Sequence, residues 1–120
     1  MHKILVVDDE KMIADAIGRI LTKAGHFVTV VTSGIEALGE LKEKEFDLAI
    51  MDLLMSELNG EELLDWIMSN KLKTKVLMMT AYGDARLRQQ LLDKGASDVL
   101  AKPFDDIFAI TRLVDKLFSE

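Results

Sequence analysis

The chain has 120 residues, a length that suits one globular domain. Its formal net charge of -6 argues against direct nucleic-acid binding by this domain, because contacts to phosphates need clustered lysine and arginine. There is no cysteine for a disulfide or a thiolate metal site, and the apolar runs are too short for a membrane span or a signal peptide. We therefore expect a cytoplasmic protein that does not bind membranes.

Strand-like and helix-like segments alternate along the chain. Continuous apolar runs predict strands that are covered on both faces, as in a parallel sheet. The expected strands are residues 3–8, 27–32, 47–52, 75–80 and 98–101. The expected helices are residues 11–24, 34–44, 60–70, 84–94 and 105–118. Five strand–helix repeats with right-handed crossovers predict one doubly wound, three-layer α/β/α domain with a five-stranded parallel sheet over residues 1–120.

Two of the expected helices carry start signals. Ser33 with Glu36, and Asn59 with Glu62, have the spacing of capping boxes. Two glycines stand where helices would end: Gly25 and Gly95.

Acidic residues stand at the ends of two apolar runs. Asp8 and Asp9 follow the first run, and Asp52 ends the third. Ligands of doubly wound sheets bind at the carboxyl ends of the strands, so we expect the three carboxylates to converge there. Their mutual repulsion predicts a hard divalent cation, Mg2+ or Mn2+. For Asp8 and Asp9 alone, a helix cap with a first-turn charge is the alternative.

Asp52 suits two roles at such a site, metal ligand and nucleophile. A carboxylate that attacks phosphorus forms an acyl phosphate, and a bound cation offsets the charge of the two anions. Lys102 and Thr80, at the ends of other strands, are candidates to bind the phosphoryl oxygens, the alternatives being a solvated lysine and an ordinary strand-end threonine. Ala81 is small enough to leave room for the group, and Pro103 predicts a fixed turn that aims Lys102 inward.

The order and spacing of these residues resemble the receiver domain of two-component response regulators. The resemblance covers essentially the whole chain, and it implies a flavodoxin-like fold with strand order 2-1-3-4-5. The motifs that carry it are Asp8-Asp9, Asp52-Leu53-Leu54-Met55 with Gly60, Thr80-Ala81, and Lys102-Pro103-Phe104.

The resemblance also implies roles for the site residues. Asp52 would accept a phosphoryl group from a sensor histidine kinase or a phosphotransfer protein. Asp9 and Asp52 would bind Mg2+ directly, Asp8 would act through water, and the backbone carbonyl of Leu54 would be a further ligand. Thr80 and Lys102 would bind the phosphoryl oxygens.

Backbone N–H groups of Leu53 and Ala81 would assist them. The chain departs from the family pattern at Ser56, where a proline is usual, and at Val99, where an aromatic residue usually takes part in the switch with the threonine. Tyr82 is the nearest aromatic candidate, and with Leu54 it flanks the expected path of attacking water, which predicts slow self-hydrolysis.

The resemblance implies a signalling domain that is not an enzyme beyond its own phosphotransfer and dephosphorylation. Its output would pass through the face formed by the fourth helix, the fifth strand and the fifth helix, to an effector domain or protein or within a homodimer. We expect the chain to be the N-terminal domain of a longer regulator, although a stand-alone regulator stays open. Two alternatives are a degenerate receiver-like interaction module and an aspartyl-nucleophile phosphohydrolase, the second opposed by Leu54 where a general acid would stand.

Overall fold

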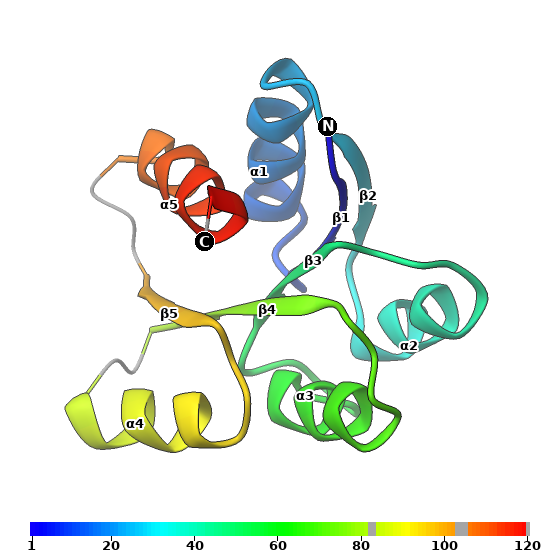
Figure 1. Cartoon of the computed structure of the whole chain (residues 1–120), viewed down its shortest axis with the longest axis vertical. Coiled ribbons are helices and arrows are strands. Elements are labelled where there is room, and N and C mark those ends of the chain that lie inside the picture. Colours follow the sequence, from blue (N-terminus) through cyan, green and yellow to red (C-terminus); the bar gives the residue numbers. More distant parts are fainter. Residues whose placement is uncertain (82–83, 103–105, 120) are drawn as a thin grey trace.

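One parallel sheet with the strand order β2-β1-β3-β4-β5 forms the centre of the computed structural model, which describes residues 1–81, 84–102 and 106–119 (Figure 1). The strands are β1 Lys3–Val7, β2 Phe27–Val31, β3 Leu48–Asp52, β4 Lys75–Thr80 and β5 Asp98–Ala101. The helices are α1 Lys11–Lys23, α2 Gly34–Glu43, α3 Gly60–Ser69, α4 Ala85–Asp93 and α5 Phe108–Ser119. The predicted three-layer fold and its strand order are confirmed.

Helices cover both faces of the sheet. α1 and α5 lie on one face, and α2, α3 and α4 lie on the other (Figure 1). Successive residues of β1 enter opposite cores: Ile4 packs with α1 and α5, whereas Leu5 packs with α2, α3 and α4. Both residues are fully buried, which explains why the strands read as continuous apolar runs. None of the described helices combines the length and apolar character that a membrane span requires.

Most of the predicted helix-capping and helix-ending residues lie at helix ends in the structure. Asn59 and Glu62 form a complete capping box at the start of α3. Ser33 accepts the N–H of Glu36 at 3.1 Å, but the Glu36 carboxylate contacts hydroxyl groups, so this box is only half formed. The glycines after α1 and α4 adopt φ of 98° and 117°, as a helix-ending glycine requires: Gly25 and Gly95.

α5 begins later than predicted. The predicted range started at residue 105, whereas the helix runs from Phe108. The Asp106 carboxylate accepts the N–H of Phe108 at 2.9 Å, and this local turn satisfies a backbone group that would otherwise belong to the helix. Residues 103–105 lie outside the described part of the chain.

Gly60 sits where α3 approaches the end of β3 most closely. Its N–H donates to the Leu53 carbonyl at 3.0 Å. A Cβ atom at this position would lie 2.5 Å from the Asp52 carbonyl oxygen and 2.9 Å from Met78 Sδ. The absence of a side chain at residue 60 therefore allows α3 to brace the loop that follows Asp52.

We expect Gly60→Ala to lower the free energy of unfolding by about 1–3 kcal/mol, because the methyl group meets backbone that cannot move freely. Gly39→Ala is the matched control. Gly39 is inside α2, a Cβ atom there would have no neighbour within 4 Å, and the substitution should stabilise by about 0.5–1 kcal/mol. Urea denaturation of both variants measures this, and equal stabilities would contradict the packing argument.

Candidate functional site

The carboxyl ends of four strands meet at one edge of the sheet. Val7 of β1 pairs with Met51 of β3, and Thr80 of β4 pairs with Ala101 of β5. The next residues along these strands are therefore brought to the same edge, which places Asp8, Asp52 and Lys102 near one another. Of the three carboxylates predicted to converge, Asp8 and Asp52 both contact Lys102, and Asp9 lines the same cavity as Asp52.

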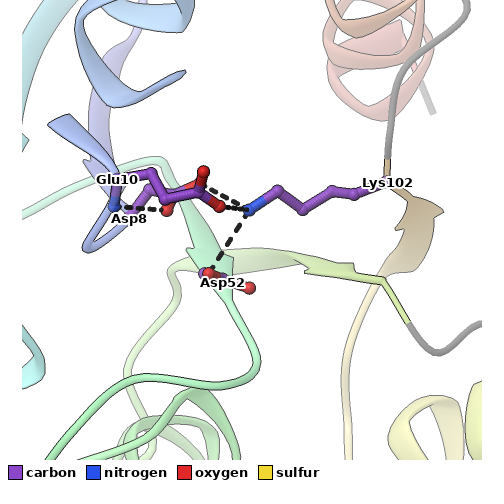
Figure 2. Close-up of polar contacts among 4 residues, drawn as sticks. All are labelled: Asp8, Glu10, Asp52 and Lys102. Carbon is purple, nitrogen blue, oxygen red and sulfur yellow. Dashed lines mark hydrogen bonds and ion pairs between the residues drawn. The ribbon is translucent and has the colours of Figure 1, made fainter. Parts of the chain in front are cut away.

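Lys102 lies at the centre of this group. Its Nζ atom is 2.9 Å from Asp8 Oδ2, 3.3 Å from Asp52 Oδ2 and 3.5 Å from Glu10 Oε1 (Figure 2). The Lys102 side chain is only 9% exposed, and the Asp8 side chain is fully buried. The backbone N–H of Lys102 donates to the Thr80 carbonyl at 2.8 Å, which fixes the lysine at the end of β5. The lysine is therefore a buried counter-ion for acids from two other strands.

Asp8 uses both of its carboxylate oxygens inside the protein. Oδ2 contacts Lys102, and Oδ1 accepts the N–H of Glu10 at 2.9 Å. The N-cap residue of α1 is Glu10, and no side chain makes a capping hydrogen bond there. The alternative in which Asp8 or Asp9 caps this helix does not match the structure.

Three consecutive acids could hold a cation. Among the residues that the structure describes, Asp8, Asp9 and Glu10 form a group whose carboxylate oxygens lie within 4.8 Å of one another. Oxygen ligands of this kind suit Mg2+, and Asp9 is exposed, so its carboxylate is accessible to a cation from solvent. Asp52 is outside that group and is connected to it through Lys102. Glu10 was missed by the sequence reasoning, although it directly extends the acidic pair.

A cavity of about 490 Å3 opens beside these groups. Asp52 is only 7% exposed, yet it reaches this cavity together with Lys102. Among the described residues, the lining consists of Asp9, Glu10, Ile13, Asp52, Leu54, Ala81 and Lys102. The buried Asp52 carboxylate is thus accessible to a small group that enters from solvent.

The electrostatics of Asp52 are those of a costly buried carboxylate. Burial, followed by the charge of Asp8, raises the pKa of Asp52 from 3.8 to about 6, and Lys102 offsets only part of that increase. For Lys102, burial opposes the charged form, but the hydrogen bond to Asp8 and the charge of Asp52 outweigh it and raise its pKa. At neutral pH the pair is therefore ionised, and Asp52 takes up a proton at a higher pH than an ordinary aspartate does.

The remaining predicted residues lie partly at the cavity and partly inside the sheet or the core. Thr80 is buried at the same edge, and Ala81 and Leu54 line the cavity. The Leu53 N–H donates to the Met79 carbonyl at 2.8 Å, so the amide that the resemblance assigns to a phosphoryl oxygen is engaged in the sheet. Val99 is partly buried in the core cluster that also includes Leu87 of α4.

Three residues singled out by the sequence, Tyr82, Pro103 and Phe104, lie outside the described residues. Ser56 is exposed, and the next residue, Glu57, has a φ of 67°. This loop therefore contains a residue with left-handed backbone geometry, which is energetically unfavourable for a residue other than glycine.

The sequence resembles curated proteins over most of its length. It is 34% identical over 116 residues to the transcriptional regulatory protein TcrA of Mycobacterium tuberculosis, which covers 95% of this chain and 46% of TcrA. It is 36% identical over 109 residues to the transcription factor SKN7 of Candida albicans, which covers 89% of this chain and 20% of SKN7. The chain spans about half or less of the length of these relatives.

Solved structures resemble the whole fold. The receiver domain of the Francisella response regulator 1452 superimposes with a TM-score of 0.93 at 30% identity, covering 99% of this chain and 98% of that one. The BeF3-activated DrrB receiver domain superimposes with a TM-score of 0.88 at 26% identity, covering 100% of this chain and 99% of that one. Residues 4–114 match the family described as the response regulator receiver domain. This match covers most of the sheet and its helices, and it agrees with the likenesses in sequence and structure. The chain therefore belongs to that family and is the receiver domain of a two-component response regulator.

Proposed function

We propose that Asp52 accepts a phosphoryl group from the phosphohistidine of a sensor histidine kinase or a phosphotransfer protein. The observation that carries this proposal is the position of Asp52, which reaches the 490 Å3 cavity and lies 3.3 Å from Lys102 Nζ. An Asp52 oxygen attacks phosphorus as the P–N bond to the imidazole breaks, and the electron pair of that bond stays on the imidazole nitrogen. Such transfers depend mainly on positioning and charge neutralisation.

Neighbouring residues neutralise the negative charge of the phosphoryl group and of the Asp52 carboxylate. Lys102 turns from the carboxylates to the phosphoryl oxygens, and the Thr80 hydroxyl and the Ala81 N–H donate to them. Leu53 would join only by releasing the Met79 carbonyl. Asp9, Asp52 and the Leu54 carbonyl would hold Mg2+ or Mn2+ directly, and Asp8 would act through water. The cation, when bound, offsets the repulsion between the two reacting anions.

The structure favours this function over the two alternatives. A phosphohydrolase needs a general acid beside the nucleophile, and the residue that lines the cavity two positions after Asp52 is the apolar Leu54. A degenerate interaction module has no need of a buried lysine between carboxylates, which is an expensive arrangement for binding alone. We therefore propose a signalling domain, with self-dephosphorylation as its only other chemistry.

We propose that residues 1–120 form one receiver domain whose output passes through the face of α4, β5 and α5. Arg88 of α4 and Asp98 of β5 form an ion pair at 2.6 Å on this face, so a shift of β5 is transmitted to α4. TcrA and SKN7 are named as transcriptional regulators, and the chain covers 46% and 20% of them. A longer regulator with an effector domain fits these lengths, and we propose that it pairs as a homodimer through this face. The absence of cysteine fits the cytoplasm.

Incubation with a small phosphodonor and Mg2+ should add one phosphoryl group, measured by intact mass. Asp52→Asn should remain unmodified, because the amide cannot act as the nucleophile, and so should the wild type with a chelator. Asp115→Asn, which neutralises an exposed acid of α5, is the control and should be modified like the wild type. Modification of Asp52→Asn would refute the assignment of the acceptor.

The stability of the domain without divalent cations should depend on the charge of Asp52. Its pKa is about 6 when folded and 3.8 in an unfolded chain, so the folded state binds more protons between these values. The contribution of Asp52 to stability therefore falls as pH rises from about 4 to about 6. Asp52→Asn should stabilise the domain at pH 7 by about 1–3 kcal/mol more than at pH 4.

Chemical denaturation in EDTA at pH 4 and pH 7 measures this difference. Glu45→Gln removes an exposed charge at the opposite edge of the sheet and should show little pH dependence. An equal effect of Asp52→Asn at both pH values would mean that burial does not raise its pKa.

Thr80 should couple phosphorylation to the output face. We expect Thr80→Ala to accept the phosphoryl group but to lose the change in amide chemical shifts of α4 and β5 that accompanies it in the wild type, because no hydroxyl follows the phosphoryl oxygens. Thr80→Ser keeps the hydroxyl and should keep the change. If Thr80→Ala responds like the wild type, the switch does not pass through this residue.

A further inference from the structure

Glu10 is a site residue that the proposed phosphotransfer leaves without a role. It stands between β1 and α1, and its Oε1 atom lies 3.5 Å from Lys102 Nζ (Figure 2). Its side chain is 64% exposed, whereas those of Asp8 and Asp52 are 0% and 10% exposed. Although Glu10 is the N-cap residue of α1, its side chain makes no capping hydrogen bond. The carboxylate is therefore not needed to start the helix.

The described residues that line the cavity carry an excess of negative charge. In the described part of the chain, its charged lining consists of Asp9, Glu10 and Asp52 against Lys102, with Asp8 buried behind the lysine. A divalent cation at the acids offsets two of these charges and still leaves the site net negative. Glu10 is the lining acid that contacts Lys102 from the solvent side, so it weakens the lysine's attraction for an incoming anion.

We propose that Glu10 selects phosphoryl donors by their charge, disfavouring dianionic donors relative to donors that carry a positive charge beside the phosphorus. This inference rests on the proposed function of Asp52. A protonated phosphohistidine is a donor of the favoured kind, because its imidazolium ring neutralises part of the phosphoryl charge. A small acyl phosphate brings two negative charges to the cavity and carries no positive group that would offset them.

Two small donors separate these cases with the same acceptor. Acetyl phosphate is a dianion at neutral pH: Asp52 forms an O–P bond, the acyl O–P bond breaks, and acetate leaves with the electron pair. Phosphoramidate carries an ammonium group, so its net charge is one unit less negative. With it the P–N bond breaks, and ammonia leaves with the electron pair. Both reactions give the same aspartyl phosphate. A change in the ratio of their rates therefore reports on the approach of the donor and the transfer step, and not on the product.

The experiment measures the initial rate of Asp52 phosphorylation with each donor at saturating Mg2+ in the wild type, Glu10→Gln and Glu45→Gln. Glu45→Gln changes the net charge equally but lies between α2 and β3, at the far edge of the sheet. For Glu10→Gln, we expect the ratio of the acetyl phosphate rate to the phosphoramidate rate to rise on the order of three- to tenfold. High salt should shrink this rise, because it screens exposed charges.

The outcomes separate the two proposals. An unchanged or lower ratio in Glu10→Gln, or an equal rise in Glu45→Gln, overturns the role of Glu10 while leaving Asp52 as the acceptor. Failure of the wild type to take a phosphoryl group from either donor overturns the proposed function, and this inference with it. Circular dichroism of Glu10→Gln should match that of the wild type, since its side chain does not cap α1.

Discussion

The buried ammonium group of Lys102 is the interaction on which the organisation of this site depends. Four strands end in polar residues at one edge of the sheet, and two of them bring the carboxylates of Asp8 and Asp52 close together. Burying such charges is unfavourable unless an opposite charge lies among them. Lys102 supplies that charge from the end of β5. The raised pKa of Asp52 indicates that the compensation is incomplete, so the charge of this carboxylate is only partly stabilised.

Incomplete compensation has a consequence for the proposed switch. Phosphorylation makes the group on Asp52 more negative, and Lys102 is the nearest cation that can follow the added charge. Its backbone N–H is hydrogen-bonded to Thr80, so the lysine and the threonine move on neighbouring, paired strands. Since Asp98 of the same strand is paired with Arg88 of α4, the proposed switch would have a short chain of contacts from the site to the outer helix.

The sequence predicts the elements well because their physical signals are local. Ile4 and Leu5 are both apolar since each meets a different core, and this pattern is visible in the sequence. The strand order is different: alternation leaves it open, and only the resemblance supplied it. The engagement of the Leu53 amide with Met79 was also invisible, because it depends on how far the β3–β4 ladder continues. Glu10 escaped notice because a polar residue at a helix start is ordinary.

The consecutive acids after β1 illustrate why the site needs a pair of carboxylates at this point and not one. The strand ends at Val7, and the two residues that follow have opposite environments: Asp8 is fully buried, while Asp9 is exposed and lines the cavity. Asp8 engages both oxygens with Lys102 and the Glu10 N–H, which leaves it little capacity for a ligand from solvent. The carboxylate of Asp9 remains available because Asp8 already neutralises the charge of Lys102. A single acid at this position could not both contact the lysine and bind the proposed cation, whereas the pair divides these two roles.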